Sequence, residues 1–256
     1  MSRLTSTFAG ALALGLCLGA PVAHAEFKLR YPQVEYREME IEHNGDTTFD
    51  KANSGKSNNQ SYTNELEYGI TRYLRLGIEG ESAAPPGHNL RYEGTALEGT
   101  FQLTPEGKYW ADFGFFAEYE QAHTRDGANA FTFGPLIQKE VSNVLGFDTV
   151  HAFNLLFTKE AGPHHSDDTP VLIAWQSRLR LNPLFEPGIE LFSQIGNIVS
   201  PGQLADQQHR LGPMFAGAYS VAPYGGVKYE VGYLFGLTRA TEQGTVRWRL
   251  EYEIPF

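Results

Sequence analysis

The C-terminal segment 244–256 alternates between apolar and charged residues almost without interruption. Successive side chains of a β-strand point to opposite faces, so an alternation of this length predicts a strand with one apolar and one polar face. Because the polar face is charged and the apolar face is rich in aromatic residues, the strand suits a closed barrel with lipid outside and a wet lumen inside. The apolar positions are Val246, Trp248, Leu250, Tyr252, Ile254 and Phe256, and the charged positions are Arg247, Arg249, Glu251 and Glu253.

The same period-two pattern recurs along the chain and predicts twelve strands in all. In the first of them, 33–43, the apolar positions change parity, which predicts a bulge near Arg37 and Glu38. The polar stretch 44–60 that follows is expected to be a long exposed loop. The other predicted strands cover residues 62–70, 74–79, 90–103, 109–119, 131–137, 147–157, 171–180, 189–195, 211–219, 227–235 and 244–256.

The links between these strands alternate in length. Links after odd-numbered strands are mostly longer and more polar than links after even-numbered strands. Outer-membrane barrels have short periplasmic turns and long outer loops, whereas a soluble β-sandwich, the alternative, has no reason to alternate in this way. We therefore predict an all-β fold: a single transmembrane antiparallel β-barrel that occupies residues 26–256, with both of its ends on the periplasmic side.

The first 25 residues have the composition of a secretory signal peptide. Arg3 precedes a short apolar run over 8–20, and Ala23-His24-Ala25 forms a small-x-small cleavage site. We expect cleavage after Ala25, export through the periplasm and a location in the outer membrane; an uncleaved anchor is the alternative. The only cysteine, Cys17, lies in this leader, so the mature chain can form neither disulfides nor thiolate metal sites.

The chain is acidic, with a formal net charge of -10, and it contains no run of basic residues. Nucleic-acid binding is therefore not expected, and no sequence motif suggests a cofactor. The expected partners are outer-membrane lipid and small solutes.

Charged residues on the inward parity are the candidate functional residues. Arginine keeps its proton and needs acceptors when buried, so these residues can form a salt-bridge network that fills the barrel. They can equally form a charged constriction that passes small polar or ionic solutes. Twelve strands do not decide between a filled and an open lumen. The candidates are Glu65, Glu67, Arg75, Glu79, Arg178, Arg180, Glu190, Lys228, Glu230, Arg247, Arg249, Glu251 and Glu253.

Metal-ligating residues occur in two polar segments. The segment with His164, His165, Asp167 and Asp168 could offer ligands, but adjacent histidines of an extended chain point apart. The acidic residues of segment 46–53 do not have the spacing of a calcium loop. We therefore expect no metal site.

A hydrolase acting on lipid or lipopolysaccharide is the alternative function, because some barrels of this size are enzymes. Ser166 beside His165 is the one tempting nucleophile–base pair, and no Gly-x-Ser-x-Gly motif is present. A lone histidine such as His151 is more often tolerated than catalytic. We assign no catalytic residue and keep a closed structural or adhesive barrel as a third interpretation.

Two motifs resemble known families. Tyr252-Glu253-Ile254-Pro255-Phe256 resembles the C-terminal signature by which Gram-negative outer-membrane barrels are recognised for insertion, although Pro255 departs from it. This resemblance implies the barrel-assembly machinery as a partner. The hairpin 65–77 resembles the E-x-x-Y-G-(L/I)-T-x-x-L-x-L-G pattern of the putative transporter family named for the MetA phenol-degradation pathway, which implies transport of aromatic compounds.

Overall fold

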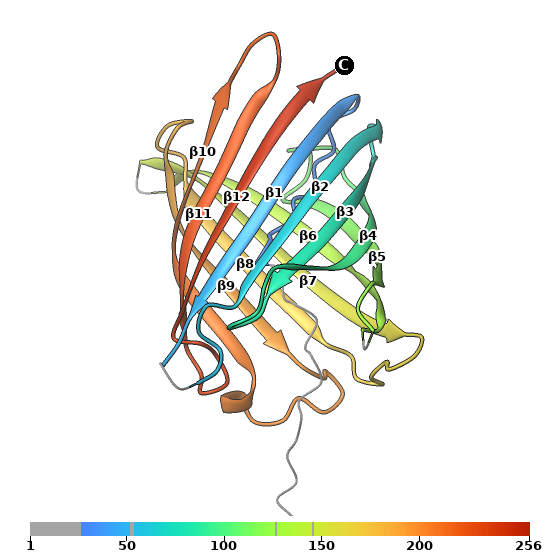
Figure 1. Ribbon diagram of the computed structural model, residues 1–256. Coiled ribbons are helices and arrows are strands. Elements are labelled where there is room, and N and C mark those ends of the chain that lie inside the picture. Colours follow the sequence, from blue (N-terminus) through green and yellow to red (C-terminus); the bar gives the residue numbers. More distant parts are fainter. Residues whose placement is uncertain (1–26, 52–53, 126, 145) are drawn as a thin grey trace, which may run out of the picture.

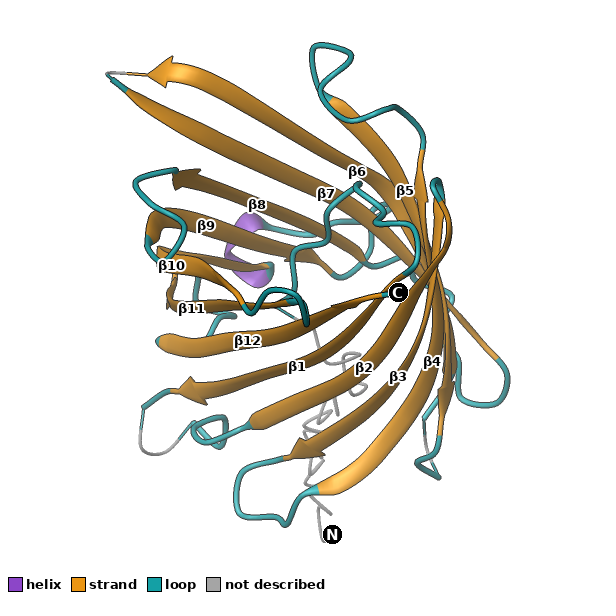
Figure 2. Cartoon of the chain, turned by 90° about the horizontal axis from the view of Figure 1, so that it is seen from above, coloured by secondary structure: helices purple, strands orange, loops and turns teal. Residues whose placement is uncertain are grey.

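The computed structural model describes residues 27–51, 54–125, 127–144 and 146–256. Within these residues, twelve antiparallel strands close into one barrel, as Figures 1 and 2 show. The predicted fold class is therefore confirmed. The predicted signal peptide lies outside the described residues. The strands are β1 (Glu38–Phe49), β2 (Gln60–Thr71), β3 (Leu74–Ala84), β4 (Arg91–Gln102), β5 (Asp112–Ala122), β6 (Asn129–Val144), β7 (Phe147–Ala161), β8 (Val171–Leu179), β9 (Glu186–Ile195), β10 (Gln208–Ser220), β11 (Gly226–Gly236) and β12 (Gly244–Pro255).

Each strand pairs with its sequence neighbours, and β12 closes the barrel by pairing with β1 over the whole length of both strands. Closure gives every strand two partners and leaves no unpaired edge, which a sheet in lipid requires. The end of the barrel that carries links 50–59, 162–170 and 196–207 is called the loop end below. The opposite end, where the C-terminus lies, is called the turn end (Figure 1).

The predicted first strand and first loop were wrong in their bounds. The structure begins β1 at Glu38, after a turn with Arg37 at a φ of 65°, and continues it to Phe49. The polar residues that suggested a loop face inward in the second half of β1, where Asn44 and Asp46 are buried. Ladders to β12 and β2 on both sides offset the low strand propensity of these residues.

The outer surface is apolar, and the interior is polar. Large apolar side chains on the outward parity of most strands are exposed, and carboxylates and guanidinium groups on the inward parity are buried. This arrangement is the reverse of a soluble domain and fits a bilayer around the barrel. In the part of the chain that the structure describes, no helix has the length and apolarity needed to cross a membrane.

Candidate functional site

The lumen is occupied by the chain segment that precedes β1. Residues 27–34, here called the occluding segment, are not part of the sheet. Lys28, Leu29 and Arg30 on this segment are almost fully buried. The segment was not predicted to lie inside the barrel, and only its last two residues, 33–34, were predicted to belong to the first strand.

Side-chain amides of the barrel wall hold the backbone of the occluding segment. The Arg30 N–H donates to Oδ1 of Asn154 on β7 (2.7 Å), and Nδ2 of Asn154 donates to the Arg30 carbonyl (2.8 Å). The Val34 N–H donates to Oε1 of Gln102 on β4 (2.9 Å). Buried backbone N–H and C=O groups need hydrogen-bond partners. The side-chain amides therefore supply hydrogen bonds that a neighbouring strand would supply in a sheet.

The two cations of the occluding segment point to an acidic wall formed by β1, β2, β4 and β5. The Lys28 ammonium lies 2.9 Å from Glu42 and also contacts Glu65. The Arg30 guanidinium lies 3.2 Å from Glu118. These contacts provide counter-charges for carboxylates that would otherwise be costly to bury.

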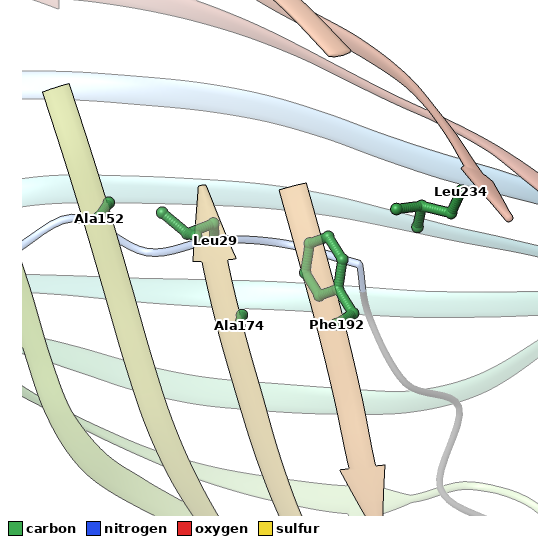
Figure 3. Packing of buried hydrophobic residues seen from close by; sticks show 5 residues of the cluster. All are labelled: Leu29, Ala152, Ala174, Phe192 and Leu234. Atoms are coloured by element: carbon green, nitrogen blue, oxygen red, sulfur yellow. The ribbon is translucent and has the colours of Figure 1, made fainter. Parts of the chain in front are cut away.

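The alternate residues of the segment pack against the opposite wall. Leu29 is 1% exposed and packs against side chains of β7, β8, β9 and β11 (Figure 3). The Tyr31 hydroxyl lies 2.9 Å from Gln176 Oε1 and 3.0 Å from Glu230 Oε1. Because an extended chain directs alternate side chains to opposite sides, one short segment touches both walls and fills the space between them. The residues around Leu29 are Ala152, Ala174, Phe192 and Leu234.

Ion pairs cross-link the remaining lumen wall. Arg247 of β12 is fully buried, its Nε lies 2.8 Å from Glu190, and its Nη2 lies 3.0 Å from Glu230. Arg75 of β3 lies 2.7 Å from Glu40 and 2.9 Å from Glu67. These ion pairs thereby join adjacent and nearby strands on the lumen side of the sheet.

Arg249 connects this network to the occluding segment. Its guanidinium contacts Glu42 and lies 2.6 Å from Glu251, and its Nη1 donates to the Leu29 carbonyl (3.3 Å). The carboxylate of Glu42 is thus shared between β12 and the occluding segment. Release of the segment would leave Arg249 and Glu42 paired with each other.

The other candidate residues lie at different depths. Glu79 is buried in β3, and Arg178 of β8 lies 3.2 Å from Glu186. Arg180 and Lys228 are exposed at the turn end. Arg180 lies 2.6 Å from Glu140 and 3.2 Å from Glu186, and Lys228 lies 3.1 Å from Glu251 and contacts Glu253.

A cavity of about 430 Å³ lies between the occluding segment and the loop end. Phe27 and Arg30 form part of its wall. Among the described residues, Arg30 is the one lysine or arginine in the lining. The cavity is therefore strongly acidic. Its acidic residues are Asp46, Glu79, Glu81, Glu93, Glu118, Glu120, Glu160, Asp168 and Asp206.

One cluster has the spacing of metal ligands. Carboxylate oxygens of Glu65, Glu67 and Glu98 lie within 4.8 Å of one another. Lys28 contacts Glu65, and Arg75 lies 2.9 Å from Glu67, so protein cations already occupy the positions around this cluster. The geometry therefore gives no reason to place a metal ion there.

The polar loop segments are held by their own hydrogen bonds. His165 Nδ1 lies 2.7 Å from the Gly162 carbonyl, and Ser166 Oγ accepts from the Asp168 N–H (3.1 Å). Ser166 and His165 thus each have a hydrogen-bond partner in the loop backbone. In the first loop, the Ser54 hydroxyl bonds to the Asp50 carboxylate and lowers its pKa.

Sequence reasoning missed the residues that close the lumen. Lys28 and Arg30 flank Leu29 in a stretch to which no element was assigned, and Asn154 is a polar residue on the inward parity of an apolar strand. The one sequence signal for this closure was the pair of basic residues, Lys28 and Arg30, directly before a barrel with many inward-facing acidic residues. Nothing in the sequence showed that the pair turns back into the lumen.

Comparisons with known proteins support the fold. No protein-family model and no curated protein matches the chain. Among solved structures, the COG4313 outer membrane channel from Pseudomonas putida F1 is similar over 93% of this chain and 100% of that chain, with 12% identity and a TM-score of 0.55. The KdgM porin in complex with disordered oligogalacturonate is similar over 86% and 99%, with 10% identity and a TM-score of 0.50. These proteins share an outer-membrane barrel fold with this chain, and the resemblance to the MetA-pathway family stays a prediction.

Proposed function

We propose that the protein is a narrow, porin-like channel of the outer membrane that conducts small cations and small cationic solutes when the occluding segment leaves its seat. The observation that carries this proposal is the acid-lined cavity, which extends from the loop end to Arg30. Fixed carboxylates in a pore attract cations and repel anions.

The occluding segment has the properties of a removable closure. It lies in the lumen and is not a strand of the sheet. Its departure therefore breaks none of the backbone hydrogen bonds between the barrel strands. It is held by hydrogen bonds from its backbone N–H groups to Asn154 and Gln102, by the ion pairs of its two cations and by the packing of Leu29. A set of separate weak contacts can be exchanged for solvent and solute one at a time, as a conducting lumen requires.

The C-terminus has a feature that suits insertion of the barrel into the outer membrane. The C-terminal Phe256 is exposed on the outside of β12, where its ring meets Tyr68 of β2 at 6.3 Å. We propose that the barrel-assembly machinery recognises this strand, and that the long loops face the cell exterior.

Single-channel recording in planar bilayers tests the channel. The folded protein is recorded under a KCl gradient, and the double variant Lys28→Ala/Arg30→Ala is compared with Lys108→Ala, which removes a cation that lies over Tyr109 at the turn end. We expect a cation-selective reversal potential, a higher open probability in the double variant and an unchanged one in the control. Absence of conductance from both the folded wild type and the double variant would contradict the proposal.

A further inference from the structure

A serine and a histidine face each other on the outward side of the barrel wall, away from the lumen. Ser193 of β9 is the cross-strand partner of His209 of β10. Their neighbours Phe192 and Arg210 are buried in the interior, so the period of two places Ser193 and His209 on the outward side. On that side Ser193 is 8% exposed and His209 is half-buried. Ser193 Oγ lies 2.8 Å from His209 Nδ1.

The hydrogen bonds of Gln207 define the tautomer of His209. Gln207 Nε2 donates to the Pro201 carbonyl (3.0 Å), which turns Oε1 toward the imidazole, 3.2 Å from His209 Nε2. An amide oxygen only accepts, so the neutral ring carries its proton on Nε2. Nδ1 then has a free lone pair and accepts the hydrogen bond from the Ser193 hydroxyl.

This order of nucleophile, base and orienting acceptor is that of serine and cysteine hydrolases. The orienting acceptor is an amide, as in Cys-His-Asn enzymes, and it keeps the base nitrogen directed at the nucleophile. Gln207 is accordingly a positioning residue, and Ser193 and His209 are the groups that would touch the substrate.

The link 237–243 fixes the backbone beneath the pair. The Thr238 hydroxyl donates to the Gln207 carbonyl (2.6 Å), and the Leu237 N–H donates to the His209 carbonyl (2.9 Å). The His209 N–H donates to Thr241 Oγ1 (3.1 Å). Such anchoring holds a base within the narrow range of positions that proton transfer needs.

Apolar side chains of the adjoining links define the substrate class. Ile198, Val199 and Leu204 on link 196–207 and Leu237 on link 237–243 are exposed, and Val199 is 84% exposed. Apolar groups of this size at the rim of a membrane barrel favour contact with acyl chains. Ser193 is two residues before the end of β9, and His209 is the second residue of β10, so the pair lies near the loop end. There the ester groups of outer-leaflet lipids would meet it.

We propose that Ser193 and His209 form an esterase site that cleaves carboxylic esters of acylated lipids in the outer leaflet. His209 Nδ1 takes the Ser193 proton while Oγ attacks the ester carbonyl carbon. The carbon–oxygen bond to the alcohol breaks, the alcohol leaves with the proton from His209, and the acyl group stays on Ser193. Water, deprotonated by the same nitrogen, then releases the fatty acid and restores Ser193.

The chain provides a matched control pair. Ser177 of β8 and His151 of β7 are also cross-strand partners on the outward side. His151 Nε2 lies 3.1 Å from Thr149 Oγ1. The two pairs share residue types and face, and differ in the hydrogen bonds that would orient a base.

The test measures ester cleavage and covalent labelling on the folded barrel in detergent micelles. The probes are p-nitrophenyl laurate and a long-chain alkyl fluorophosphonate, which bonds to an activated serine oxygen with loss of fluoride. We expect nitrophenolate release and a phosphonate adduct on Ser193, both lost in Ser193→Ala and His209→Ala and both kept in Ser177→Ala and His151→Ala. For Gln207→Ala we expect a loss of roughly tenfold or more in kcat with an altered pH profile, because the base is no longer oriented.

Barrel folding is checked for each variant by its resistance to unfolding in cold detergent, so a loss of activity is attributed to the site. Absence of cleavage above the level of Ser193→Ala, or an adduct on any serine other than Ser193, would overturn the proposal. The result is independent of conductance, since the pair lies outside the lumen.

Discussion

Replacing Leu29 by alanine should open the channel without changing its ion preference. Leu29 is 1% exposed in the seated segment, and in the released segment it would be in water. The change removes no charge and no hydrogen bond. It therefore isolates the packing contribution to closure from the ion pairs.

The magnitude follows from the burial. Complete burial of a leucine side chain contributes about 1.5–3 kcal/mol, and Leu→Ala changes in rigid surroundings cost about 2–5 kcal/mol because a cavity remains. We take roughly 2–3 kcal/mol for Leu29, since Phe27 and Tyr31 on the same segment can shift toward the space. At about 1.4 kcal/mol per tenfold change, the ratio of open to closed channels rises roughly 30- to 150-fold.

Single-channel recording measures this ratio directly. Leu103→Ala is the control, because Leu103 is exposed at the turn end and makes no contact with the lumen cluster. The reversal potential under a salt gradient should be the same in Leu29→Ala and wild type. An open probability that stays within about twofold of wild type would refute the reasoning that packing of Leu29 holds the segment in place.

Three further changes have defined outcomes. Asn154→Leu removes both amide hydrogen bonds to the occluding segment and, at about 1–3 kcal/mol for each stranded group, should raise open probability at least tenfold in the same recordings. Arg247→Met leaves Glu190 buried with an uncompensated charge and should lower the free energy of unfolding in urea by about 3–5 kcal/mol, with recovery in the Arg247→Met/Glu190→Gln double variant. Glu118→Gln removes a cavity carboxylate and should lower the cation-to-anion permeability ratio, whereas the exposed Asp167→Asn should leave it unchanged.

The barrel itself was predictable because its signal is local. A barrel strand requires only that apolar and polar residues alternate along it. That alternation is visible in 244–256 and in most other strands. The same rule gave wrong bounds for β1. Its inward residues Asn44 and Asp46 are typical of loops, and they fit a strand only when the strand faces a polar lumen. A polar composition predicts loops only where the interior is apolar.

Local pattern determined which side of each strand meets lipid, but only the tertiary structure decided that a segment of the chain occupies part of the lumen. Lys28 meets Glu65, Arg30 meets Asn154, and Leu29 meets Arg249, in contacts that join residues 37, 124 and 220 positions apart. No periodicity encodes such contacts, because they arise when closure of the barrel brings opposite walls within reach of one short segment. The pairing of Ser193 with His209 has the same origin, since the register between β9 and β10 places the two side chains opposite each other.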